Sequence, residues 1–166
     1  MSRRAMRTIV VGIGNLILGD DGIGIHIVRS VQKHRQTRDD VTFDEVQTGG
    51  MNLLDVIRGY DKAILIDAVS FSEVDHGRVR RFHISDLPTV HSNNPHDVSF
   101  PDALLLAEKI GDPDIPDDIT IIGVNLGQVP MEFTEELSPH IKECIPTAVS
   151  MVLDELQNDS MIDNEK

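Results

Sequence analysis

The chain has 166 residues, enough for one domain with a single substantial core, and its 40% hydrophobic content is ordinary for a globular protein. Its 28 acidic and 15 basic side chains give a net charge of -13, which repels phosphate backbones, and only 4% of residues are aromatic, so we expect no nucleic-acid partner. Cys144 is the only cysteine, which excludes an internal disulfide and a zinc cluster built from cysteines.

The first predicted element is a strand over residues 7–13, which is apolar throughout and should be buried on both faces. This stretch superficially resembles a signal peptide, but Gly12, Gly14 and Asn15 interrupt it and acidic residues follow it. No apolar segment of the sequence is long enough to span a membrane. We therefore expect a cytoplasmic protein without a membrane partner.

A helix, a strand, a short helix and another strand are predicted next. Residues 22–35 carry an apolar stripe and end in basic side chains, which favours a helix. A strand is predicted at 41–47, a short helix at 51–58 that Gly59 ends, and a strongly apolar, central strand at 62–69.

The second half of the chain begins with a predicted strand over residues 78–84. The connection before it is shorter than the roughly one dozen residues that a parallel crossover needs, so we expect this strand to run antiparallel at a sheet edge. Ser99 and Pro101 begin a predicted helix that Gly111 ends. A further strand is predicted at 118–125.

The last predicted element is a helical region that begins at Ser138 and is kinked or restarted at Pro146. We expect a single domain over residues 1–166, with a core from about residue 7 to 157 and a disordered tail at 158–166. The alternation of strands and helices predicts an α/β fold. It should be a three-layer sandwich in which a mixed, mostly parallel five-stranded sheet has helices on both faces and one antiparallel edge strand.

Acidic residues follow the carboxyl ends of two strands, where open α/β sheets build their sites. Asp20 and Asp21 come after the glycine turn that ends the first strand, and Asp67 ends the apolar run of the 62–69 strand, its expected neighbour. Carboxylates brought together there repel each other unless a proton or a cation joins them. Helix capping or hydrogen bonds to loop amides would give them a structural role instead. We assign Asp20 to capping or support and Asp21 to the crevice.

A histidine is the expected third member of such a site, because two carboxylates and one imidazole suit zinc, nickel or a similar divalent ion. Of the seven histidines, His96 lies in the turn-rich segment 92–97 before a predicted helix and is our first choice. His91 is the second choice. Composition alone does not decide between them.

The spacing Gly12-x-Gly14 after a strand also begins a dinucleotide-binding fingerprint. Ile17 stands where the third glycine of that fingerprint belongs, and Asp20 and Asp21 would repel a pyrophosphate. A nucleotide-binding α/β domain is therefore a weaker alternative.

The run from Gly12 to Gly24, GIGNLILGDDGIG, resembles the opening motif of the hydrogenase maturation proteases. These endopeptidases remove a C-terminal peptide from the large-subunit precursor of nickel–iron hydrogenases. Shorter matches follow in the same order up to about residue 157. They are Gly49-Gly50-Met51, Ile66-Asp67-Ala68, Pro95-His96-Asp97, Gly123-Val124 and Leu137-Ser138-Pro139.

The resemblance implies the family's α/β sandwich, a trio of catalytic residues that also contact the metal, supporting residues and a substrate-binding glycine loop. The catalytic and metal-contacting trio would be Asp21, Asp67 and His96. The supporting residues would be Asn15 and Asp20, and the substrate-binding glycines would be Gly49 and Gly50.

The implied enzyme is a monomeric endopeptidase, aspartic-type or metal-dependent, that acts on the hydrogenase large-subunit precursor after nickel insertion. We expect the metal to be nickel presented by this substrate, and zinc or another divalent ion could substitute for it. A non-catalytic nickel-binding chaperone, which holds the large subunit without cutting it, is the alternative.

Overall fold

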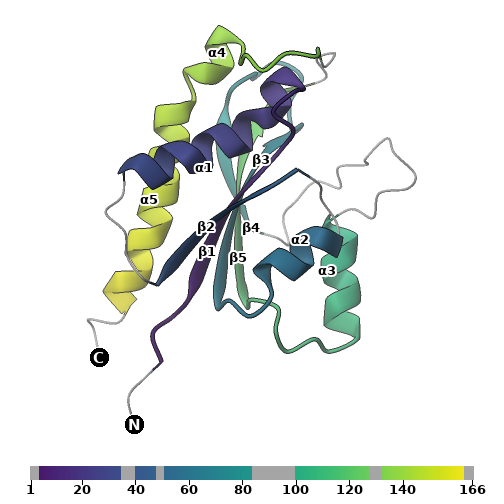
Figure 1. Ribbon diagram of the computed structural model, residues 1–166, viewed down its shortest axis with the longest axis vertical. Coiled ribbons are helices and arrows are strands. Elements are labelled where there is room, and N and C mark those ends of the chain that lie inside the picture. Colours follow the sequence, from purple (N-terminus) through teal and green to yellow (C-terminus); the bar gives the residue numbers. More distant parts are fainter. Residues whose placement is uncertain (1–3, 35–39, 48–50, 84–99, 128–131, 163–166) are drawn as a thin grey trace.

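The computed structural model describes residues 4–34, 40–47, 51–83, 100–127 and 132–162 (Figure 1). Its five strands form one sheet in the order β2-β1-β3-β5-β4. Neighbouring strands are parallel except at the edge pair, where β4 runs antiparallel to β5. The strands are β1 (Thr8–Ile13), β2 (Val41–Val46), β3 (Lys62–Val69), β4 (Val79–His83) and β5 (Asp118–Asn125).

Helices cover both faces of this sheet (Figure 1). Helices α1, α4 and α5 lie on one face, and α2 and α3 lie on the other. A 3-10 turn, η1, leads into α1. The bounds are η1 (Gly19–Gly22), α1 (Ile23–His34), α2 (Met51–Ile57), α3 (Phe100–Lys109), α4 (Pro139–Lys142) and α5 (Ile145–Ile162). The three-layer α/β sandwich is the predicted fold. Among the described residues, no helix has the length and apolarity needed to cross a membrane.

The central strand β3 shows how the sequence builds the two cores. Its side chains alternate between the faces, so Ile64 and Ile66 pack with α1 and α5, whereas Leu65 and Val69 pack with α2 and α3. Burying a side chain of this size contributes about 1.5–3 kcal/mol to folding. A strand that is apolar on both sides is therefore held at the centre of the sheet.

Several predicted features are confirmed. β1 and β3 are neighbours, β4 is the antiparallel edge strand, and the last helical region restarts near Pro146 as α5. α5 continues to Ile162, into the first residues of the 158–166 stretch for which we expected disorder, and residues 163–166 lie outside the described residues. Apolar side chains up to Leu156 pack against the sheet and hold the preceding turns of α5, from which the helix continues.

A cluster of charged side chains joins α5 to the amino ends of the strands. The Lys62 ammonium lies 3.2 Å from a Glu155 carboxylate oxygen and 3.4 Å from a carboxylate oxygen of Asp118. Arg81 reaches the other Glu155 oxygen at 2.6 Å. Lys62 and Glu155 are both buried, so their charges are compensated within the fold.

Candidate functional site

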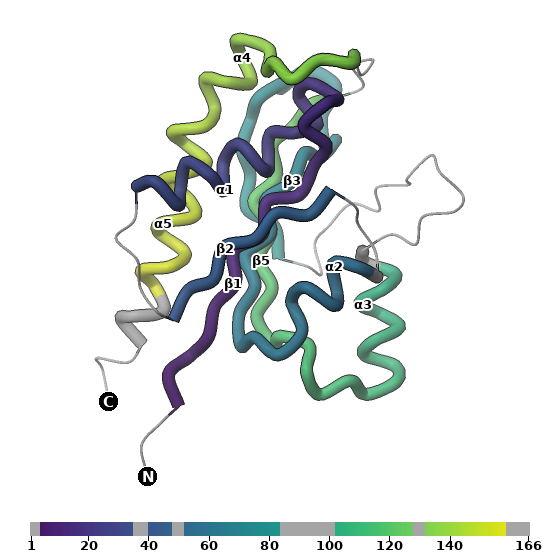
Figure 2. Tube along the Cα trace, in the orientation of Figure 1, coloured from purple at the N-terminus to yellow at the C-terminus, as the bar shows by residue number. Residues whose placement is uncertain are grey.

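Glycines bring helix α1 against the carboxyl ends of β1 and β3. A Cβ atom on Gly24 would overlap the carbonyl oxygens of Ile13 and Ile66, and one on Gly12 would overlap Gly24 and Val28. The backbones of helix and strands are therefore in direct contact, which only glycine permits. This contact places η1, with its acidic residues, at the carboxyl edge of the sheet (Figure 2).

Asp21 is half-buried in η1 and is held from the loop before it. Its Oδ2 accepts a hydrogen bond from the Asn15 backbone N–H at 3.1 Å. The Asn15 side chain in turn accepts a hydrogen bond from the Ile17 N–H at 3.1 Å, which keeps the loop folded. Burial raises the pKa of Asp21, and the hydrogen bond from Asn15 opposes this effect only in part.

Asp20 makes a different contact from its neighbour. Its two carboxylate oxygens accept hydrogen bonds from the backbone N–H and the hydroxyl of Ser138, both at 2.7 Å. Ser138 immediately precedes α4, so this pair fastens η1 to the last helical region. The contact joins two elements of the fold, and the predicted role of Asp20 in the site stays a prediction.

Asp67 lies near the end of β3, on the face covered by α2 and α3, because it is two residues from both Leu65 and Val69 and side chains alternate along a strand. Its pKa lies well above the ordinary value, first because burial disfavours the charged form and second because the Asp21 charge repels it. A hydrogen bond from the Ala68 N–H acts in the opposite direction. The fold thus brings Asp21 and Asp67 close enough to repel each other.

A pocket of about 210 Å³ opens beside Asp21. One wall is a short ribbon in which Leu18 and Thr134 pair as a parallel β-bridge. The Gly19 N–H donates to the Thr134 carbonyl at 2.7 Å, and the Thr134 N–H donates to the Ile17 carbonyl at 3.0 Å. The lining comprises Leu18, Gly19, Asp20, Asp21, Leu126, Gly127, Glu132, Thr134, Glu136 and Ser138.

The other predicted site residues cannot be placed. His96, His91, Gly49 and Gly50 lie outside the described residues. Within the described part of the chain, no group of three or more histidines, cysteines and acidic residues could hold a metal ion. The two carboxylates are therefore the part of the predicted trio that the structure brings together.

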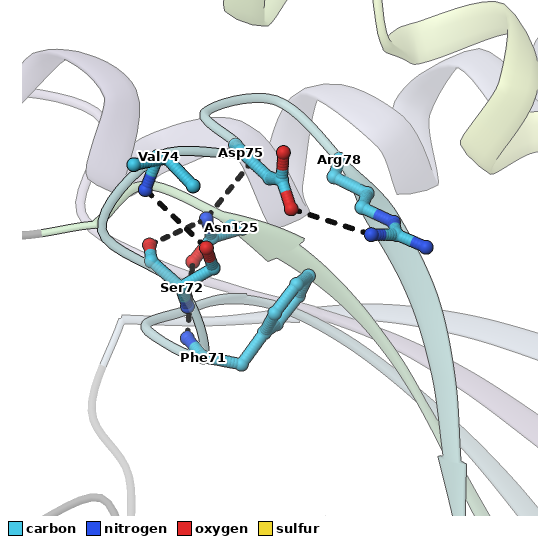
Figure 3. A network of polar contacts seen from close by, with 6 residues as sticks. All are labelled: Phe71, Ser72, Val74, Asp75, Arg78 and Asn125. Carbon is cyan, nitrogen blue, oxygen red and sulfur yellow. Dashed lines mark hydrogen bonds and ion pairs between the residues drawn. The ribbon is translucent and has the colours of Figure 1, made fainter.

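Asn125 is a buried residue at this edge that sequence reasoning missed. Its Oδ1 accepts hydrogen bonds from the backbone N–H groups of Phe71 at 3.0 Å and Ser72 at 3.2 Å. Its Nδ2 donates to the carbonyls of Ser72 at 2.8 Å and Asp75 at 2.9 Å (Figure 3). One amide thus fixes the β3–β4 connection against the end of β5. The available signal was a polar residue ending an apolar strand, the same pattern that identified Asp67.

The family model for hydrogenase maturation proteases matches residues 25–155 of the chain. The chain belongs to the hydrogenase maturation protease family. The matched range begins just after η1 and includes Asp67, His96 and Asn125. This confirms the resemblance found in the sequence and identifies the chain as a peptidase of hydrogenase maturation.

Similar proteins extend this assignment over almost the whole chain. The coenzyme F420 hydrogenase subunit delta of Methanothermobacter thermautotrophicus is 30% identical over 155 residues, covering 89% of this chain and 93% of that protein. The hydrogenase 2 maturation protease of Escherichia coli is 29% identical over 149 residues, covering 89% and 84%. The structure of a hydrogenase maturating endopeptidase from E. coli superposes with a TM-score of 0.77 at 27% identity, covering 93% and 94% of the two chains. This hydrogenase maturation protease therefore has the family's α/β fold.

Proposed function

We propose that the protein removes a C-terminal extension from the large-subunit precursor of a nickel–iron hydrogenase after nickel has been inserted, with Asp21, Asp67 and His96 contacting the metal. The observation that carries this proposal is the Asp21–Asp67 pair. Their mutual repulsion at the sheet edge is relieved by a divalent cation, which is the species that an inserted nickel ion would present.

The metal in this proposal is part of the substrate, and it marks the precursor as ready for cutting. Carboxylate and imidazole ligands suit nickel, and zinc or another divalent ion can take the same donors. Such ligands bind metal only when deprotonated, so metal and proton compete for the Asp67 carboxyl. Recognition should therefore weaken as pH falls.

The protein's own groups then account for the hydrolysis, as in an aspartic-type endopeptidase. The Asn15 N–H holds one oxygen of Asp21, so the carboxylate has a fixed direction toward water or metal. A carboxyl with a raised pKa can accept a proton from the attacking water and return it to the leaving nitrogen. The water oxygen bonds to the carbonyl carbon, the peptide C–N bond breaks, and the tail leaves with a free amino group.

The test is to incubate the protein with nickel-free and nickel-loaded precursor and to follow the precursor mass. We expect the loaded precursor alone to lose a C-terminal peptide. Equal cleavage of both forms would show that the site does not recognise the metal. Binding of the loaded precursor without any mass loss would instead identify the protein as a chaperone.

A further inference from the structure

Two exposed apolar side chains stand together beside the site, on the outer side of the pocket wall. Ile17 is 52% exposed and Phe133 is 87% exposed, and two such side chains side by side form an apolar patch that a single exposed residue would not. Each directly precedes a partner of the Leu18–Thr134 bridge, so the two lie next to each other on the ribbon. We call Ile17 and Phe133 the apolar lip.

The two sides of this ribbon differ in character. Leu18 and Thr134 face the pocket that contains Asp21. Ile17 and Phe133 are not among the residues that line this pocket, and both are exposed to solvent.

Negative charge surrounds the apolar lip. Glu132, Glu135 and Glu136 are exposed and lie within a few residues of Phe133. An apolar contact ringed by carboxylates complements a partner patch with an apolar centre and basic side chains around it.

We propose that the apolar lip docks the body of the hydrogenase large-subunit precursor through such a patch and so holds the tail in the pocket. This assignment rests on the proposed function, because it takes the same precursor as partner. It differs from the role of the carboxylates: the lip supplies affinity and orientation, whereas Asp21 and Asp67 act on the metal and the scissile bond.

Docking by the lip is tested with Phe133→Ser and Ile17→Ser, assayed with the nickel-loaded precursor. We expect each variant to raise Kd and KM by about tenfold while kcat at saturation stays near the wild-type value, because exposed anchors contribute to binding rather than to chemistry. Ile110→Ser is the matched control. Ile110 is 71% exposed just beyond α3, at the end of the molecule where the chain approaches the start of β5, and its substitution should change neither value.

Charge reversal gives a second, independent measurement. Glu135→Lys should weaken binding and reduce its salt dependence, because it removes an attraction to basic side chains on the partner. Wild-type affinity in both lip variants, with normal cleavage by the wild-type protein, would overturn the docking assignment alone. A wild-type protein that neither binds nor cuts the precursor would overturn the proposed function and the docking assignment with it.

Discussion

The two ends of the sheet treat acidic side chains in opposite ways. At the amino end, the buried Glu155 contacts two cations, Lys62 and Arg81. At the carboxyl end, Asp67 is only partly exposed and is repelled by the negative charge of Asp21. The same fold therefore compensates the charge of Glu155 with cations and leaves Asp67 beside a carboxylate that repels it. We call this uncompensated repulsion the electrostatic conflict. Such a conflict within an otherwise consistent structure is typical of a functional site, because it persists only where something outside the fold resolves it.

The largest effect on precursor processing should come from removing the Asp67 carboxylate at the carboxyl end of the sheet. Asp67→Ala should reduce processing of the nickel-loaded precursor at least about a hundredfold, since it removes a metal contact and an acid–base group. Mass spectrometry of the precursor measures the loss, and thermal unfolding checks that the fold is retained. Near-normal processing by a folded Asp67→Ala protein would contradict our site assignment. Asp118→Ala at the amino end is the matched control and should process normally.

At the amino end the corresponding change should damage the fold instead. Glu155→Gln should lower the free energy of unfolding by about 3 kcal/mol, because it leaves the buried Lys62 without its closest carboxylate. Urea denaturation gives this value. Asp118→Asn, which alters the half-exposed partner of Lys62, should cost less than about 1 kcal/mol. A Glu155→Gln protein as stable as wild type would mean that the ion cluster does not hold α5.

A third prediction concerns which histidine is the third metal ligand at the carboxyl end of the sheet. His96→Ala should weaken nickel or zinc binding by at least about tenfold, whereas His91→Ala should leave it unchanged. Affinity of the wild-type protein should also fall as pH drops through the imidazole range, because only neutral imidazole binds metal. Isothermal titration with either metal measures both effects. The reverse order of the two variants would show that His91 is the ligand.

The smallest predicted effect is a gain in stability. The pKa of Asp67 in the folded protein lies well above its ordinary value of 3.8, so the ionised form destabilises the fold at neutral pH. Below pH 3.8 the acid is protonated in both folded and unfolded states, and this penalty disappears. Asp67→Asn should therefore be more stable than wild type at pH 7, by a margin that shrinks on acidification. Denaturation at several pH values checks this, with the exposed Asp55→Asn as a control. A variant less stable than wild type at pH 7 would show that the ionised Asp67 carboxylate does not destabilise the fold.

The sequence predicted most of the fold because the governing signals are local. The apolar run of β3 indicated a central strand, and the short connection before β4 indicated its antiparallel direction. The pairing of β1 with β3 was predicted because open α/β sheets reverse their strand order at a switch point, and β1 and β3 were expected to be the neighbours there. Those two strand ends led to Asp21 and Asp67, and the Asp21 charge contributes to the raised pKa of Asp67.

Contacts between distant segments were not predictable in the same way. Ser138 binds Asp20 across 118 residues, and the types of these two residues do not predict that they are in contact. The Leu18–Thr134 bridge is a single pair, too short to leave a strand pattern in the sequence. Asn125 acts through the amide of one side chain, which satisfies backbone groups of a loop that lies 50 to 54 residues earlier in the chain.

The backbone contact between Gly24 and the ends of β1 and β3 limits how the site can respond. With α1 pressed onto the strands, and Asp20 fastened to Ser138, η1 has little freedom to carry Asp21 away from Asp67. The repulsion between the carboxylates cannot relax by movement. In the proposed recognition of a substrate metal, the incoming cation would meet two carboxylates that closely packed glycines already hold in position, so little ordering entropy would be lost at these two groups on binding.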